Sequence, residues 1–190
     1  NWPGGAADPE TGIMYIFTKS DVGNMSMSSR PDRSDMNYIN LQSRRAPPYR
    51  IDGLPLIKPP YGQIVALDLN KGEILWDAVH GETPDSIRNH PALTGLDIPP
   101  TGQAGRVGAL VTKTLVIAGD GGRYTNANGQ QEAMLRAYDK LSGEQLGALP
   151  MPAQQTGSPM TYAIDGMQYL AVSISGGDVA GRLRVYSYQP

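Results

Sequence analysis

The stretch Ala66-Leu67-Asp68-Leu69-Asn70-Lys71-Gly72-Glu73-Ile74-Leu75-Trp76 decides the fold. It is typical of a strand, a tight turn and a second strand that ends in an aromatic residue. Asp68 and Gly72 suit the turn, because Asp can bond its own backbone two residues on and Gly accepts a positive φ. The continuous apolar run at 64–67, in front of the turn, predicts a strand that is buried on both faces.

The same frame occurs at two more places along the chain. It recurs at Ala137-Tyr138-Asp139-Lys140-Leu141-Ser142-Gly143-Glu144, and a weaker copy lies at Ala7-Asp8-Pro9-Glu10-Thr11-Gly12. The Asp and the Gly of each copy are four residues apart. A repeated strand-turn-strand unit indicates a repeat architecture, for which the β-propeller is the natural candidate.

Length and composition agree with an all-β domain. The chain has 190 residues, of which 23 are Gly and 16 are Pro, so turn-forming residues are abundant. The net charge of -2 gives no general attraction to nucleic acid or anionic membranes, and the absence of Cys excludes disulfides and thiolate metal sites. No apolar run approaches the ~20 residues of a membrane-spanning helix. Since the chain opens at Asn1 without Met or a leader, we expect it to begin inside a structural unit, as a processed piece or a fragment would.

Apolar runs and turn residues predict eleven strands in groups of four, four and three. This grouping fits two complete four-stranded blades and a third blade that lacks one strand, so we predict an all-β fold, a β-propeller fragment of about three blades. Residues 1–190 are taken as a single partial propeller domain. Its blades are 1–79, with a long polar insertion at 19–60, then 105–149, and the incomplete closing blade 158–190. Several prolines argue against regular structure in 80–104.

These residues resemble a known family. The segment 66–76 resembles the tryptophan-docking motif of quinoprotein dehydrogenases, the eight-bladed propellers that carry pyrroloquinoline quinone (PQQ). Asn1-Trp2, followed by the segment 7–15, is similar to the entry into one of their later blades. The segment 105–112 is similar to their Gly-Gly-x-x-Thr strand, and 157–169 with 175–177 is similar to the closing blade of the glucose-dehydrogenase branch. The second motif departs from the pattern, because Gly147 stands where the Trp would be.

The resemblance implies the C-terminal three blades of a PQQ-dependent dehydrogenase that oxidises a sugar or an alcohol. Its implied chemistry is hydride transfer from the substrate carbon to the quinone, with a carboxylate base and Ca²⁺ that polarises the quinone. In this family the base and the calcium ligands come from earlier blades, so no catalytic residue and no metal ligand is expected in this chain. The implied partners are the remaining blades, a small substrate and a quinone or cytochrome electron acceptor. The implied location is the bacterial periplasm.

Three residues are predicted to contact the cofactor. In the alcohol-oxidising members of the family, the Asn that matches Asn1 contacts the quinone ring system, where a side-chain amide can donate to a quinone oxygen. Trp2 can line the cofactor chamber or pack between blades. Arg106 stands where the Gly-Gly strand approaches the central channel, and a guanidinium can clamp a PQQ carboxylate with two hydrogen bonds. For Asn1 and Arg106 the alternatives are a ragged chain end and an Arg that faces solvent.

Other conspicuous residues favour structural roles. Trp76 is explained by the docking contact, an aromatic plane wedged between blades. His80 and His90, with Glu82 and Asp85, resemble a metal cluster only superficially, and a loop held by hydrogen bonds explains them better. The glycines at 119–122 lack the Lys and the following helix of a phosphate site and indicate a turn.

Two other functions compete with the dehydrogenase. A non-catalytic propeller scaffold, as in outer-membrane assembly lipoproteins, uses the same blade motif; Asn1-Trp2 and the segment 159–162 argue against it. An inactive fragment that pairs its open strand edges with a second copy is the third possibility.

Overall fold

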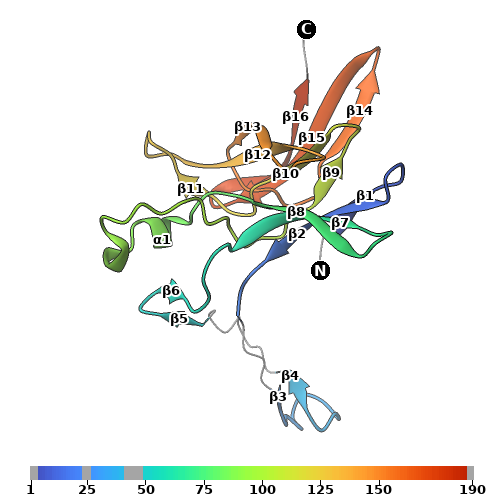
Figure 1. The fold of residues 1–190 in the computed structure, drawn as a ribbon. Helices are drawn as coiled ribbons and strands as arrows, with labels where there is room; N and C mark the ends of the chain where they lie inside the picture. The colour runs from blue at the N-terminus through green and yellow to red at the C-terminus, as the bar shows by residue number, and fades with distance from the viewer. Residues whose placement is uncertain (1–3, 23–26, 41–48, 188–190) are drawn as a thin grey trace. The chain divides into compact units, whose positions relative to one another are not determined.

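A computed structural model describes residues 4–22, 27–40 and 49–187 (Figure 1). The chain divides into two compact units, one formed by residues 1–20 with 59–190 and the other by residues 21–58. The larger unit is built mainly of three antiparallel sheets, which confirms the all-β prediction. No helix of the described part is long and apolar enough to cross a membrane.

The first sheet contains the strand-turn-strand segment 66–76. Its strand order is β1-β2-β7-β8, and each pair is antiparallel. The strands are β1 (Gly5–Asp8), β2 (Ile13–Lys19), β7 (Gly62–Asp68) and β8 (Glu73–Val79). The prediction of burial on both faces of the apolar run is wrong: Ile64 and Ala66 are fully buried, whereas Val65 and Leu67 are half-buried. Side chains alternate along a strand, and only one face of β7 packs on the second sheet.

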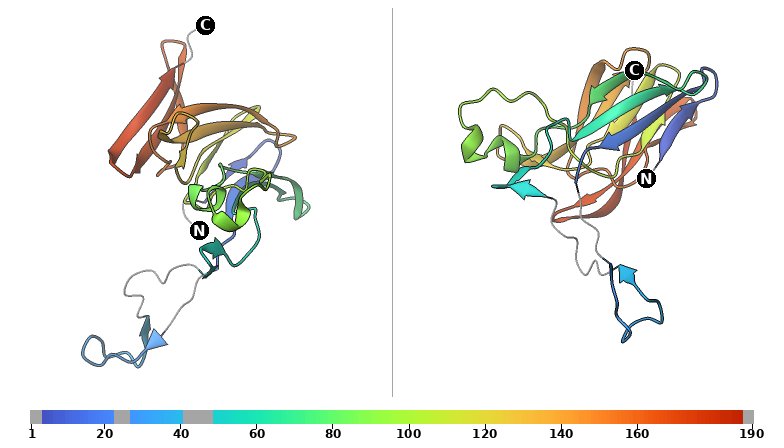
Figure 2. Two further views of the ribbon diagram at one scale, coloured as in Figure 1. Left: turned by 90° about the vertical axis from the view of Figure 1, so that its left-hand side faces the viewer. Right: turned by 60° about the horizontal axis from the view of Figure 1, so that its bottom comes forward.

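The third sheet has the three strands that were predicted, and the second has five where four were predicted. The second has the order β9-β10-β12-β13, with the short β11 paired on β12, and the third has the order β14-β15-β16. Figure 2 shows the third sheet beside the second. The strands are β9 (Ala109–Val111), β10 (Leu115–Gly119), β11 (Tyr124–Thr125), β12 (Gln131–Asp139), β13 (Gln145–Met151), β14 (Met160–Ile164), β15 (Met167–Gly176) and β16 (Val179–Ser187).

The three repeated turns have one geometry. In each, the Gly amide donates to the carbonyl of the Asp four residues earlier, at 2.9, 2.7 and 2.9 Å for Gly12, Gly72 and Gly143. The Asp carboxylate accepts from the amide two residues on, and the three glycines have φ of 70, 72 and 74°. The repeat in the sequence is therefore a repeat of one hydrogen-bonded turn.

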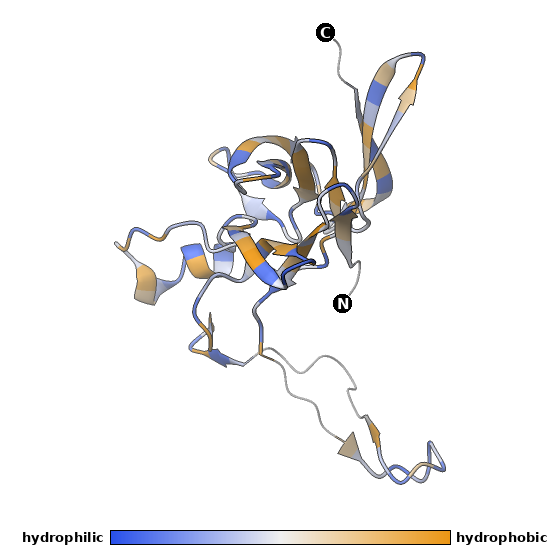
Figure 3. Cartoon of the chain, turned by 45° about the vertical axis from the view of Figure 1, so that its right-hand side comes forward, coloured by the Kyte–Doolittle hydropathy of each residue, from blue (hydrophilic) through white to orange (hydrophobic). Residues whose placement is uncertain are grey.

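Two apolar clusters join the sheets. The cluster between the first and second sheets includes Tyr15, Ile64 and Val116, and the cluster between the second and third includes Ile117, Met151, Val172 and Ile174. Val116 and Ile117 are neighbours on β10, so the alternation of side chains lets one strand serve both interfaces. Figure 3 shows the apolar residues gathered on the strands of these sheets.

The insertion and the long connection contain more regular structure than the sequence indicates. Residues 21–58 include two short hairpins, β3 (Met27–Ser28) with β4 (Ile39–Asn40) and β5 (Arg50–Ile51) with β6 (Leu54–Pro55). The connection after β8 includes one turn of helix, α1 (Asp85–Arg88), and the 3-10 helix η1 (Pro91–Leu93). Each of these two helices begins at a proline, since Pro84 precedes α1 and Pro91 is the first residue of η1. Proline is tolerated there because the first amides of a helix have no acceptor within the helix, so no hydrogen bond is lost.

Candidate functional site

Long connections of the larger unit leave the sheets at one end, where the β15–β16 turn also lies, and the three Asp-to-Gly turns lie at the other end. Segments 80–108, 120–130 and 152–159 meet at this loop end. The amide of Gln103 donates to the carbonyl of His80 and the amide of Gln155 to that of Asp120, each at 3.0 Å. Gly105 lies so close to the 119–122 turn that a Cβ on it would stand 2.5 Å from the Cα of Gly121. The turn predicted at 119–122 is thus part of a close backbone contact.

A buried group of charges lies beneath these connections. Asp120 is fully buried and accepts from Arg136, with Nε–Oδ1 and Nη2–Oδ2 distances of 2.7 and 3.2 Å. The same guanidinium donates to Glu82 at 3.1 Å and to the side-chain oxygen of Gln145 at 3.0 Å. Burial opposes charge on Arg136, but the hydrogen bond and the charge of Asp120 raise its pKa above the ordinary value. The group is therefore a charged, fully paired cluster that ties the connection after β8 to the second sheet.

His80 lies next to this cluster and is fully buried. Its Nδ1 is 2.7 Å from the Tyr138 hydroxyl, and its Nε2 is 3.0 Å from the carbonyl of Gly119. Burial lowers the pKa of His80 and raises that of Tyr138, so both rings are neutral near pH 7. These contacts give His80 a structural role between the first and second sheets.

Asp85 and His90 also have hydrogen-bond partners. The carboxylate of Asp85 accepts from the Thr125 amide and hydroxyl and from Gln131. His90 caps η1, where its Nδ1 accepts from the amide of Ala92 at 3.2 Å. The interpretation of this loop as one held by hydrogen bonds is confirmed. Among the residues that the structure describes, no group of three His, Cys, Asp or Glu side chains is placed to hold a metal ion.

Arg106 is the predicted cofactor contact that the structure describes. It is exposed on the loop end, between the buried residues Gln103 and Val107. Its guanidinium forms no ion pair with any described residue. Asn1 and Trp2 lie outside the described residues.

Gln103 is a residue of the loop end that sequence reasoning missed. Its side-chain amide donates to the carbonyl of Arg123 at 3.1 Å, and its Oε1 is buried without a hydrogen-bond partner in the described part of the chain. A buried acceptor without a hydrogen bond lowers the stability of the fold, so this oxygen is a position at which a further hydrogen-bond donor would be favourable. Nothing in the sequence singles out a lone Gln in a Gly- and Pro-rich loop.

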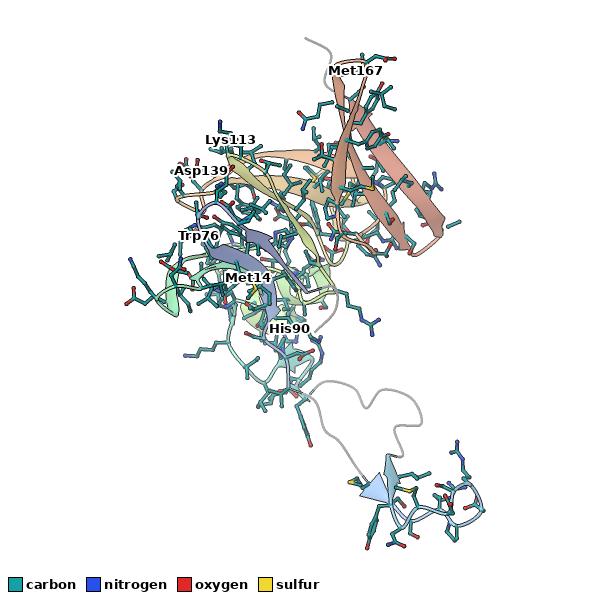
Figure 4. The ribbon with its side chains drawn as sticks, turned by 90° about the vertical axis from the view of Figure 1, so that its right-hand side faces the viewer. Met14, Trp76, His90, Lys113, Asp139 and Met167 are labelled. Atoms are coloured by element: carbon teal, nitrogen blue, oxygen red, sulfur yellow. The ribbon has the colours of Figure 1, made fainter. Side chains whose placement is uncertain are left out.

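Trp76 makes the predicted docking contact between sheets. Its indole Nε1 donates to the carbonyl of Lys140 at 3.1 Å, and its ring lies against Gly143, where a Cβ would stand 2.6 Å from a ring atom. Trp76 and Asp139 are labelled in Figure 4, near the turn that follows β12. At Gly147, where the second motif lacks its Trp, the space beside the backbone is open. Trp76 is therefore a packing residue.

Comparison with known proteins identifies a family. The family model for PQQ, described as glucose/ethanol/alcohol dehydrogenase, beta-propeller domain, matches residues 1–170. The quinoprotein glucose dehydrogenase of Escherichia coli (strain K12) is 33% identical over 135 residues, which cover 65% of this chain and 14% of that protein. The 1-butanol dehydrogenase (cytochrome c) of Thauera butanivorans is 23% identical over 188 residues, which cover 95% of this chain and 22% of that protein.

A solved structure has the same fold. The quinohemoprotein alcohol dehydrogenase from Comamonas testosteroni superposes with a TM-score of 0.57 at 20% identity, over 92% of this chain and 22% of that one. The chain thus spans less than a quarter of the length of each of these three proteins.

Proposed function

Because the chain belongs to the glucose/ethanol/alcohol dehydrogenase β-propeller family of PQQ proteins, we propose that it forms one side of the cofactor chamber in a PQQ-dependent dehydrogenase. The family match over residues 1–170 carries this proposal. The three stacked sheets support it, since they supply the blade scaffold on which such a chamber is built.

The residues of the loop end fit part of a PQQ site. PQQ is a flat quinone with three carboxylates, and when bound it would supply the hydride-accepting chemistry of the proposed reaction. Arg106 is exposed and without an ion-pair partner in the described part, so its guanidinium is available to a carboxylate. Asn1 and Trp2 are proposed as two further contacts, from the family resemblance. The buried Asp120–Arg136 pair holds the connection that carries Arg106 but is itself fully engaged.

The remaining chemistry is proposed to lie elsewhere in the propeller. A carboxylate base and Ca²⁺ with its ligands would come from other blades, and this chain alone would be inactive. We propose a sugar or an alcohol as the substrate, and a quinone or a cytochrome as the electron acceptor. Two relatives, a quinoprotein glucose dehydrogenase and a 1-butanol dehydrogenase (cytochrome c), support these classes. The proposed location is the periplasm.

The test compares this chain with the longer gene product that contains it. Each is titrated with PQQ in the presence of Ca²⁺ while tryptophan fluorescence is recorded, and dye-coupled oxidation of glucose and of short alcohols is then measured. We expect saturable binding and turnover in the longer protein and no turnover in this chain. If neither protein binds PQQ, the dehydrogenase proposal is wrong, and a scaffold propeller is the better account.

A further inference from the structure

A cavity of about 660 Å³ opens between the second and third sheets, away from the loop end. Its walls come from the β9–β10 hairpin, from β13 and from all three strands of the third sheet. The volume lies within the range of roughly 300–1,000 Å³ that is usual for small-molecule sites. No residue proposed for PQQ binding lines it, so this cavity is independent of the proposed function.

The surface of the cavity wall is mainly apolar, although polar side chains also line it, namely those of Thr112, Thr114, Thr161, Gln168 and Ser187. Leu110, Leu115 and Ile117 form one side, and Leu170 faces them from the third sheet. Tyr186 also lines it, and its hydroxyl is already engaged, because it donates to the carbonyl of Pro150 at 3.2 Å. An apolar chain placed here would remove hydrocarbon surface from water on both sheets.

The charge at this cavity has one sign. Lys113 lies at the turn of the β9–β10 hairpin, is exposed, and forms no ion pair with any described residue (Figure 4). No Asp or Glu is among the lining residues. Lys113 also borders a second cavity, which Asp8 and Glu10 line, but Asp8 is paired there with Lys140 at 2.8 Å.

We propose that this cavity binds a small aliphatic carboxylate, with its chain between the two sheets and its carboxylate at the Lys113 ammonium. An apolar wall with a single cation beside it complements a molecule that has an apolar tail and one anionic end. The ligand needs an anionic end, because a purely apolar molecule would leave the Lys113 ammonium without a counter-charge. It needs an apolar tail, because a short anion would leave the apolar part of the wall in contact with water.

The test is calorimetric titration of the full chain with decanoate and, separately, with decanol. We expect saturable binding of decanoate at one site. Lys113→Gln, which keeps the length of the side chain and removes its charge, should weaken decanoate about tenfold, as expected for the loss of one charge-assisted hydrogen bond. Decanol should bind more weakly than decanoate and should be unaffected by this substitution.

Lys71→Gln is the matched control, because Lys71 is an exposed lysine at a turn of the first sheet, with a side chain that is 65% accessible. It should leave decanoate binding unchanged. Circular dichroism of each variant checks that the fold is intact. Equal affinity of decanoate for the original chain and Lys113→Gln would overturn the proposal. So would equal affinities of decanoate and decanol, an equal loss in Lys71→Gln, or the absence of saturable binding.

Discussion

Asp8 and Lys140 join the first two sheets at the turn end, although they are 132 positions apart. The ammonium lies 2.8 Å from the carboxylate, and both side chains are 7% exposed. The hydrogen bond from Lys140, with a further one from the Thr11 hydroxyl, lowers the pKa of Asp8 from 3.8 to about 2. Because the pKa of this carboxyl is lower in the folded state than in the unfolded state, its ionisation stabilises the fold at pH values above the unfolded-state pKa. This stabilisation is lost as the pH falls toward the folded-state pKa.

The first prediction concerns acid stability. The urea midpoint of the unsubstituted chain should fall between pH 4 and about 2. The Asp8→Asn variant should have a lower midpoint than the unsubstituted chain at pH 6, and its midpoint should fall less between pH 4 and about 2. Asp97→Asn, at an exposed carboxyl, is the control and should follow the unsubstituted chain. The same loss of midpoint in Asp8→Asn as in the unsubstituted chain would show that the ion pair does not set the acid limit.

The second prediction concerns Arg136. Arg136→Met would leave Asp120 fully buried without its cation, which typically costs about 3–5 kcal/mol. Asp120→Asn added to Arg136→Met should recover part of this loss, because the uncompensated charge is removed. Arg184→Met, at an exposed arginine of the third sheet, should change the free energy of unfolding by less than about 0.5 kcal/mol. Chemical denaturation measures all three, and an Arg136→Met variant as stable as Arg184→Met contradicts the account.

The turns at Gly72 and Gly143 have the same geometry. A comparison of the two therefore distinguishes the cost of backbone strain from the cost of disturbing the Trp76 contact. Gly72 and Gly143 have φ of 72 and 74°, but a Cβ on Gly72 meets open space, whereas one on Gly143 meets the Trp76 ring at 2.6 Å. Both substitutions to Ala place a side chain at positive φ, at a cost of about 1 kcal/mol. Only Gly143→Ala also crowds the contact between the sheets.

We therefore expect Gly143→Ala to lower the free energy of unfolding by about 1–3 kcal/mol more than Gly72→Ala does. Combining Gly143→Ala with Trp76→Leu should remove most of this difference, because the crowded ring is gone. Urea denaturation of Gly72→Ala, Gly143→Ala, Trp76→Leu and the double variant gives the comparison. Equal effects of the two Gly substitutions would mean that the Trp76 contact is absent in solution.

The elements that the sequence predicts well are those specified by local chemistry. The Asp-to-Gly turns and the Asp165-Gly166 hairpin require particular backbone angles, and residues that tolerate them are visible in the sequence. The hairpins of 21–58 and the helix α1 were missed, because short elements in polar, Pro-rich segments carry little periodicity. The burial of β7 was overestimated, because an apolar run does not reveal how many of its faces are covered.

The candidate site was predictable only in part. Arg106 is exposed in the loop before β9, and its predicted contact with a cofactor stays a prediction. The Asp120–Arg136–Glu82 cluster was missed. Glu82 and Arg136 are 54 positions apart in the sequence, and they meet only because the connection after β8 packs on the second sheet. A charged Arg136 within the apolar segment 134–138 was the available signal.

Apolar side chains remain exposed on the first and third sheets of the chain. Ile74 of the first sheet is 64% exposed and Leu183 of the third is 59% exposed, with Ile164 at 55%. Exposed apolar sheet surface and open strand edges favour association. We expect this chain alone to self-associate at micromolar concentration, and Ile164→Lys with Leu183→Lys to reduce the association. Light scattering after size exclusion measures the mass, and a concentration-independent monomer would contradict this expectation.

In the proposed function, Arg106 contacts PQQ in a dehydrogenase. The most direct measurement is the PQQ affinity of the longer gene product with Arg106→Gln, against Arg182→Gln on the third sheet as the matched control. Loss of one charge-assisted pair predicts that Arg106→Gln binds PQQ about tenfold or more weakly, with Arg182→Gln unchanged. Equal PQQ affinities of the two variants and the unsubstituted protein would contradict the claim.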